Sequence, residues 1–251
     1  MAKQSGIIKL EGTIGDVTFY KSKDGLLARS KGGVDASRIQ SDEAFQRTRE
    51  NNSEFGRAGS AGKLMRLAFR NYLQNAADSK MVSRLTQKMM AVVKADSVSA
   101  RGARNVLDGE LELLQGFDFN IDGKLSSTLF MPYTTSIDRA TGIAGVSIPE
   151  FNPMNSVKAP DGATHVRFVV LCATIDFENS NYEIVTAQSA DIALTNAKVP
   201  GSDLTGELQV NSPHPMFVVL GVEFYQQVNG VSYALKGGKS NALCLVKVSG
   251  V

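Results

Sequence analysis

The segment from Asp118 to Gly123 carries the residue spacing that is closest to a metal-binding motif. Asp118, Asn120 and Asp122 alternate before a glycine, as in the first half of a calcium-binding EF-hand loop, where such oxygen ligands hold the ion. The twelfth position of that loop needs a bidentate glutamate, but Leu129 stands there. The flanking residues also alternate as in strands rather than helices. We therefore expect a structural hairpin with its turn at residues 122–123, and no metal site.

Other residue types that carry catalysis are few and scattered. The chain has two histidines, His165 in a predicted strand and His214 between two prolines, which are too few for a multi-histidine metal centre. The stretch Gly238–Ser240 ends like a phosphate-binding loop, but Tyr233 occupies the place of its first glycine and a strand follows. Carboxylates that are distant in the sequence could still pair in the fold. We predict that the protein is not an enzyme and has no catalytic, cofactor-binding or metal-binding residues.

The two cysteines and the hydropathy of the chain bear on its compartment. Cys172 and Cys244 lie in apolar runs with strand periodicity, so we expect buried free thiols rather than a disulfide. No stretch approaches the roughly 20 apolar residues that cross a bilayer, and the first residues lack the apolar core of a signal peptide. The expectation is a protein with no membrane association, cytoplasmic until assembly, and in the virion if a phage encodes it.

A group of cations between residues 47 and 70 is the main candidate for binding a partner. Lys63, Arg66 and Arg70 follow one another at helical spacing, which predicts a positive stripe. Clustered cations can bind phosphate backbones, but few aromatic residues lie among them, which favours a solvated face or a protein-protein surface. The candidate partner interface comprises Arg47, Arg49, Phe55, Arg57, Gly62, Lys63, Arg66 and Arg70.

Residues 41–105 are predicted to form a basic helical segment. Ser41 or Asp42 would cap its first helix. One face of that helix recurs at spacings of three and four: Phe55, Ala58, Gly62, Met65, Phe69, Tyr72 and Ala76. Its small residues would let another backbone approach, either a partner's or a second helix of the same chain. That second helix is expected to start at residues 78–79, to end before Asp96 and to place Val82, Leu85, Met89 and Val92 inward. Residues 97–105, which include Arg101 and Arg104, are expected to form a basic connector after it.

Residues 1–40 are predicted to form an N-terminal β arm. Ile7, Ile8 and Leu10 favour a first strand, and residues 17–22 and 26–29 favour a hairpin across the Asp-Gly pair at residues 24–25. A lone hairpin is at best marginally stable in water, so it must pair with another strand of its own chain or of a neighbour.

Residues 106–251 have the period of two that is typical of strands. Strands are predicted around Phe117 and at 125–131 on either side of the turn at 122–123, at 166–172, at 216–225 and 231–235 flanking Asn229-Gly230, and at 241–248. The stretch 149–162, rich in Pro, Gly and Asn, is the nearest thing to a linker. About eight or nine short strands without helices between them predict an antiparallel, immunoglobulin-like β-sandwich. The fold class is therefore α+β: an N-terminal hairpin arm and two helices, followed by the sandwich.

The charge is divided between the two parts of the chain. Residues 1–105 carry 19 Lys and Arg against 10 Asp and Glu, whereas residues 106–251 carry 8 against 15. This division favours either an anionic partner for the basic part or head-to-tail packing of the basic part on a neighbour's acidic part. Two solvated surfaces are the alternative.

Several motifs of the N-terminal third match one family. They are residues 12–21 (GTIGDVTFYK), 29–34 (RSKGGV), 45–51 (FQRTREN), 54–56 (EFG) and 83–87 (SRLTQ). On these residues, mainly over 6–110, the chain resembles a family of uncharacterised proteins of Bacteroidota bacteria and their mobile elements. The family has no established activity, so no site residues follow from it. The resemblance implies a phage or prophage structural protein, in which N-terminal arms and sandwich domains are common.

These observations predict a structural protein of a multi-subunit particle. The expected particle is a bacteriophage virion, with the chain as a capsid-associated, neck or tail protein whose partners are copies of itself or other particle proteins. No cofactor is expected. The alternative is a cytoplasmic nucleic-acid-binding protein that uses the cations of the basic segment. An extracellular adhesin would need a secretion signal.

Overall fold

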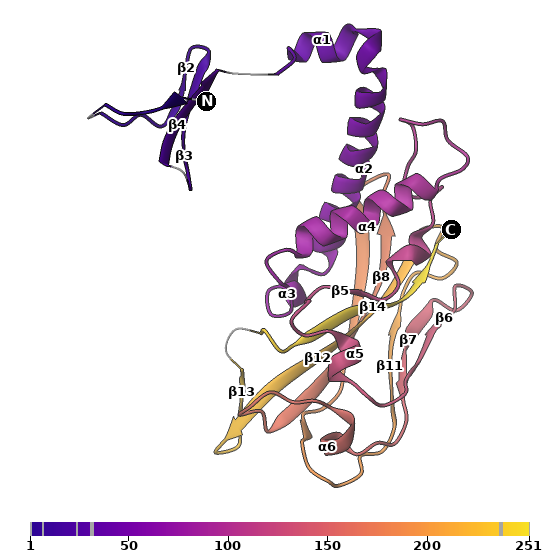
Figure 1. Ribbon diagram of the computed structural model, residues 1–251. Helices are drawn as coiled ribbons and strands as arrows, with labels where there is room; N and C mark the ends of the chain where they lie inside the picture. The colour runs from indigo at the N-terminus through magenta and orange to yellow at the C-terminus, as the bar shows by residue number, and fades with distance from the viewer. Residues whose placement is uncertain (1, 7, 24, 31–32, 236–237, 251) are drawn as a thin grey trace. The chain divides into compact units, whose positions relative to one another are not determined.

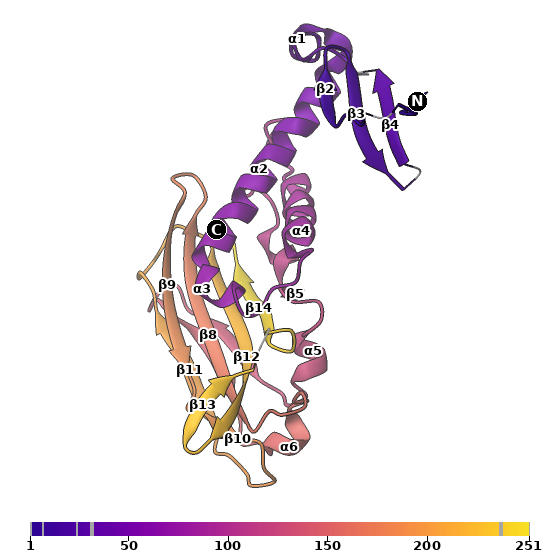
Figure 2. The same ribbon diagram turned by 90° about the vertical axis from the view of Figure 1, so that its left-hand side faces the viewer.

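The chain forms two compact units. The computed structural model (Figures 1 and 2) describes residues 2–6, 8–23, 25–30, 33–235 and 238–250. The units are Met1–Glu50 and Asn51–Val251, and helix α2 (Gln46–Ala68) contains the border between them. The described strand pairs are antiparallel, and the fold class is α+β. The sequence predicted segments ending at residues 40 and 105, whereas the compact units divide at residue 50.

The first unit contains one four-stranded sheet in the order β1-β4-β3-β2. Its strands are β1 (Ala2–Lys3), β2 (Gly12–Ile14), β3 (Val17–Ser22) and β4 (Gly25–Ser30). The predicted hairpin is confirmed: Ser22 pairs with Gly25, whose φ of +109° suits glycine. Asp24 and Ile7 lie outside the described residues. The predicted strand at Ile8 and Leu10 is wrong, because the Gln4 side chain hydrogen bonds the backbone of Leu10 and holds a loop there.

Helical structure begins earlier than the sequence predicted. Helix α1 (Ala36–Ser41) starts after Asp35, whose carboxylate accepts a hydrogen bond from the Ser37 backbone N–H. Asp42 then caps the 3-10 helix η1 (Glu43–Phe45) by accepting from the Ala44 N–H at 2.9 Å. Ser41 is therefore the last residue of α1 rather than a cap, and α2 follows η1 directly.

The second unit begins with helices that cover a sheet. After α2 come α3 (Arg70–Leu73) and α4 (Met81–Ala95), and later the short helices η2 (Leu111–Leu114), α5 (Leu125–Thr128) and α6 (Pro153–Ser156). The buried residues of α4 include Leu85, Met89 and Val92, as predicted, but Val82 is 44% exposed. Val82 lies on the first turn of α4, where it lines a surface groove instead of the core.

Ten described strands follow residue 106 and form two antiparallel sheets. The seven-stranded sheet contains β5 (Phe117–Asp118), β8 (His165–Asp176), β9 (Asn181–Gln188), β10 (Ile192–Ala193), β12 (Met216–Val228), β13 (Val231–Ala234) and β14 (Ala242–Ser249). The three-stranded sheet contains β6 (Thr134–Ile137), β7 (Ile143–Ile148) and β11 (Ser202–Glu207). The hairpin at Asn229-Gly230 is confirmed, since both residues have positive φ and Val228 pairs with Val231.

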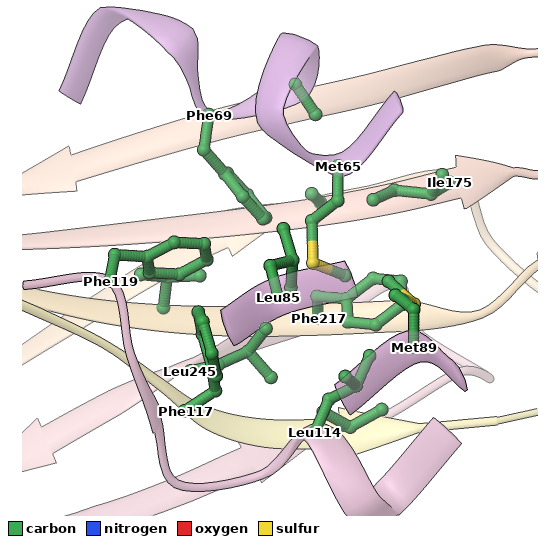
Figure 3. Close-up of a cluster of buried hydrophobic side chains, with 14 of the residues drawn as sticks. Met65, Phe69, Leu85, Met89, Leu114, Phe117, Phe119, Ile175, Phe217 and Leu245 are labelled. Carbon is green, nitrogen blue, oxygen red and sulfur yellow. The ribbon is translucent and has the colours of Figure 1, made fainter. Parts of the chain in front are cut away.

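The central strand β8 shows how the layers are arranged. The side chains of β8 alternate between two cores. Leu171 and Ile175 belong to the set that packs against α2 and α4. Phe168 and Val170 belong to the set on the opposite face, which packs against the three-stranded sheet. In the first of these cores Met65 of α2, Met89 of α4 and Phe217 of β12 point toward one another (Figure 3). The predicted sandwich of two antiparallel sheets is confirmed at this level, but helices cover its other side. The helical segment therefore shares its core with the large sheet.

Two predictions within residues 106–251 are wrong. Residues 125–131 do not pair with the strand at Phe117; β5 pairs with β14, and the Asp118 carboxylate accepts a hydrogen bond from Leu125 N–H at the start of α5. The expected absence of helices fails at η2, α5 and α6, which are too short to show a helical period in the sequence. The expected linker 149–162 lies inside the second unit, where Phe151 pairs with Val199.

Both cysteines are free and buried, as predicted. Burial raises the pKa of the Cys172 thiol to about 11 and also raises the pKa of Cys244. Neither thiol is therefore ionised near neutral pH, which makes both poor nucleophiles. No helix of the described residues is long and apolar enough to cross a membrane.

Candidate assembly surfaces

The sheet of the first unit has almost no core of its own. Among the described apolar residues of this unit, Leu27 alone is buried. In its strands Ile14 is 61% exposed and Val17 is exposed, and Ile8 and Val34, in the segments beside the strands, are exposed as well. A sheet needs a packed apolar face to be stable, because pairing alone does not offset the conformational entropy lost on folding. This sheet therefore presents apolar residues that a covering layer would bury.

The edges of the same sheet are short. The edge strands β1 and β2 have two and three residues, so the open backbone groups at each edge are few. Short edge strands limit uncontrolled pairing with other chains. The edges of this sheet therefore offer little backbone for pairing with another chain, whereas its faces offer apolar side chains.

Two of the predicted interface cations belong to the first unit, and they differ in role. The Arg49 guanidinium donates to the carbonyls of Ile39 and Asp42, both at 2.8 Å, and so holds α1 against the start of α2. Arg47 forms an exposed ion pair with Glu50 at 2.8 Å, and its side chain is 71% exposed. Arg49 is a structural residue, whereas Arg47 is accessible to a partner.

Arg57 orders the basic connector of the second unit instead of facing a partner. Its guanidinium donates to the carbonyls of Gly102 and Arg104 at 2.7 and 3.0 Å. The buried Glu54 carboxylate accepts from the Gly102 N–H at 2.8 Å. The segment that the sequence predicted as a connector is therefore a folded loop fastened to α2.

Asp96, at the end of α4, holds the other side of this loop. Its carboxylate accepts hydrogen bonds from the backbone N–H groups of Val98, Ser99 and Asn105 at 2.8 to 3.0 Å. These bonds, the one from Ser99 foremost, lower the pKa of Asp96 to about 2. The carboxylate is thus charged at any physiological pH, and it is bound by backbone N–H groups of its own chain.

Gly62 and Phe55 lie in opposite environments. Gly62 is buried where α2 crosses α4, and a Cβ there would lie 3.7 to 3.8 Å from Leu85 and Met89. Phe55 is 56% exposed and does not join the buried face, which begins near Ala58. Phe55 instead borders a groove of about 550 Å³. The groove is also lined by Val82, Ser83, Thr86, Gln87, Met90, Ala91 and Lys94.

The remaining cations gather on the outer face of α2 and at the first residue of α3. Lys63 and Arg70 are exposed and have no ion-pair partner among the described residues, and Leu67 between them is 43% exposed. Arg66, on the same side, is half-buried, and its Nε donates to the Gly62 carbonyl at 3.2 Å. Gly59 has open space where a Cβ would stand, as does Gly56 one turn earlier. We call this surface, defined by Gly56, Gly59, Lys63, Arg66, Leu67 and Arg70, the cationic helix face.

An acidic surface that the sequence prediction missed lies on the three-stranded sheet. Asp203, Thr205 and Glu207 of β11 alternate with the buried Leu204 and Gly206, so the first three face outward. Register places Ser147 beside Asp203, the buried Gly145 beside Thr205 and the exposed Ile143 beside Glu207, and it places Thr134 and Ser136 on the far side of β7. The sequences of β6, β7 and β11 contain no lysine or arginine. We call this surface, defined by Thr134, Ser136, Ile143, Ser147, Asp203, Thr205 and Glu207, the acidic sheet face.

Another groove of the second unit has a volume of about 610 Å³. It is lined by Ser53, Gly56, Arg57, Ser60, Ala61 and Leu64 of α2, by residues 105–108, and by Phe177, Glu178 and Ser180 after β8.

Among the described residues no group of three or more His, Cys, Asp or Glu is placed to hold a metal ion. At the loop that resembled a calcium site, Asn120 donates to the Lys239 and Asn241 carbonyls, so its side chain serves the fold.

No family model matches the sequence, and neither a curated protein nor a solved structure is significantly similar to this chain. These comparisons therefore indicate no function for the chain. Of the eight predicted interface residues, the fold brings Lys63, Arg66 and Arg70 together on one face. It places Arg57, Gly62 and Phe55 elsewhere in the second unit, and Arg47 and Arg49 in the first.

Proposed function

We propose that this chain is a non-enzymatic structural protein of a multi-subunit particle, and that the particle is a bacteriophage virion. The observation that carries the proposal is the first unit, whose four-stranded sheet buries Leu27 alone among its described apolar residues. Such a sheet gains a core when another subunit covers it. The partners are copies of the chain or other particle proteins, and the sheet acts as an N-terminal arm.

The second unit provides the bulk of the subunit in this proposal. Its two antiparallel sheets support an immunoglobulin-like sandwich, here backed by α2 and α4. The virion assignment draws on the motifs of residues 12–21 and 45–51, which resemble those of mobile-element proteins of Bacteroidota. Capsid-associated, neck and tail positions are all compatible with an arm and a compact body.

Hydrogen exchange of the full chain, followed by mass spectrometry, tests the proposal. In a dilute monomer, peptides that span β3 and β4 should exchange fast because little is buried around them, whereas β8 and β12 stay protected. In assembled oligomers or purified particles, β3 and β4 should become protected. Strong protection of β3 and β4 in the dilute monomer would show that the sheet needs no partner, and would count against an assembly role.

Nucleic-acid binding is the second candidate function. Residues 51–105 carry ten Lys and Arg against three Asp and Glu, which favours a polyanionic partner. Three of the predicted contact residues, Arg49, Arg57 and Arg66, hydrogen bond backbone carbonyls of their own chain, which favours the structural role instead. Binding to DNA or RNA should weaken steeply with salt, and no affinity at about 50 mM salt would rule this candidate out.

A further inference from the structure

We propose that the cationic helix face of one copy packs on the acidic sheet face of the next copy, so that the chains associate head to tail. The inference rests on the proposed assembly function and names one contact by which that assembly forms. It concerns the second unit alone, because both faces belong to residues 51–251.

The two faces have opposite charge. The helix face carries Lys63, Arg66 and Arg70 without an acidic residue among its members, and the sheet face carries Asp203 and Glu207 without a basic one. The carboxylates of Asp203 and Glu207 have no ion-pair partner among the described residues, as is true of Lys63 and Arg70. Charges left unpaired at these positions favour complementary contacts and suppress contact between like faces.

The two faces also suit each other sterically. The small members Gly56 and Gly59 leave the backbone of α2 accessible, since a Cβ at either would meet nothing within 4 Å. On the sheet, Asp203 lies beside Ser147, with Thr134 on the next strand, whereas Glu207 lies beside Ile143, which is 40% exposed. A helix can lie on this sheet with Leu67 of the helix face against Ile143 of the sheet face as the apolar contact between the charged residues.

The placement of the faces requires a second copy. One face of the seven-stranded sheet packs on α2 and α4, and its other face packs on the three-stranded sheet. The cationic and acidic faces therefore look outward on opposite sides of the same unit, so a chain cannot pair its own two faces. A contact between two different surfaces is heterologous and repeats into a ring or a filament, which is what a multi-subunit particle requires.

Charge reversal tests the contact. We would make K63E/R70E, which turns the helix face negative, and D203K/E207K, which turns the sheet face positive. In sedimentation velocity at about 50 mM salt the wild-type chain should associate as its concentration rises, and about 500 mM salt should reverse this by screening. Each variant alone should lose at least about tenfold in association, because its two faces carry the same sign.

The equimolar mixture of the two variants is the decisive measurement. Both contacts of an alternating chain are again complementary, so association should return to near the wild-type level. Matched controls are K80E/K88E and E110K/D161K, which change the charge by the same amount at exposed positions outside the two faces. Circular dichroism and thermal unfolding check that each variant is folded.

Three outcomes would overturn the contact: association of either variant alone at the wild-type level, no recovery in the mixture, or equal losses in the controls. Loss of binding to a 20-base oligonucleotide in K63E/R70E, with association unchanged, would assign the helix face to nucleic acid instead. Protection of β3 and β4 in the oligomers decides the assembly function separately. If that protection persists while the charge reversals have no effect, the assembly role stands and this contact does not.

Discussion

Asp96 and Arg57 show how single polar residues turn a basic stretch into ordered structure. Asp96 accepts three backbone hydrogen bonds from the loop that follows α4, and Arg57 donates to two carbonyls of the same loop. Each bond satisfies a backbone group that would otherwise compete for water. Arg57, which was predicted to contact a partner, therefore forms its hydrogen bonds within its own chain.

The lowered pKa of Asp96 predicts a specific dependence of stability on pH. The carboxylate has a pKa of about 2 in the folded chain and of ~3.9 when unfolded, so its stabilisation is complete above about pH 4 and is lost as the pH falls through about 2. Asp96→Asn should lower the midpoint of thermal unfolding at pH 7, and the difference from wild type should shrink as the pH falls to about 3.

Asp161→Asn is the matched control, because Asp161 is exposed and its side chain forms no hydrogen bond among the described residues. It should unfold as the wild type does at each pH. A deficit of Asp96→Asn that stays constant from pH 7 to pH 3 would contradict the role assigned to the ionised carboxylate.

At the scale of elements, the packing around α4 shows which glycines lie at a contact too close for a side chain. The sequence suggested that Gly62 allows close backbone approach, and Gly62 does face α4. The distances to Leu85 and Met89 are those of ordinary contact, so a methyl group fits. Gly109 is different, since a Cβ there would lie 2.3 Å from the Val92 carbonyl oxygen.

Glycine-to-alanine substitutions separate these cases. Gly62→Ala should raise the free energy of unfolding by up to about 1 kcal/mol, because alanine favours a helix interior. Gly59→Ala, at an open position of the same helix, is the control and should gain about the same. Gly109→Ala should cost roughly 1 to 3 kcal/mol through overlap with α4. Urea unfolding measures all three, and a loss in Gly62→Ala beside a gain in Gly59→Ala would show that the helices are too close for a methyl group.

Local signals in the sequence predicted several elements well. The Asp-Gly and Asn-Gly pairs located the hairpins β3-β4 and β12-β13, because their turns require positive φ. The helical period located α2 and α4, although Val82 was assigned to the buried side and is exposed. The helix α5 was mistaken for a strand, because four residues show no period and its first N–H is held by Asp118, seven residues away.

At the scale of the whole molecule, the two units differ in how much they bury. The second unit has two apolar cores, one on each side of the seven-stranded sheet, whereas the first has a sheet with a single buried apolar residue among those described. Free energies of local opening follow the apolar surface that an element buries. The units should therefore open independently in a dilute monomer.

Limited trypsin digestion makes this difference measurable. The first cuts in a dilute monomer should fall at Lys21, Lys23 or Arg29, and a fragment that contains the second unit should persist, since Arg84 and Arg167 lie in packed elements. Assembly should slow these first cuts by covering β3 and β4. Early cleavage within residues 106–235, or equal rates in monomer and oligomer, would contradict the uneven stability and the covering role of a partner.

By itself, the sequence determined what depends on neighbouring residues: the hairpins at glycine turns, the periods of α2, α4 and the long strands, the buried free thiols, and the division of charge between residues 1–105 and 106–251. These features follow from backbone preference and composition. The tertiary structure decided which charges remain accessible, because Arg57 and Asp96 bond to a loop while Lys63, Arg70, Asp203 and Glu207 face outward. It also decided that the cationic and acidic faces lie on opposite sides of one sheet, since strand order and packing bring together residues that are far apart in the chain.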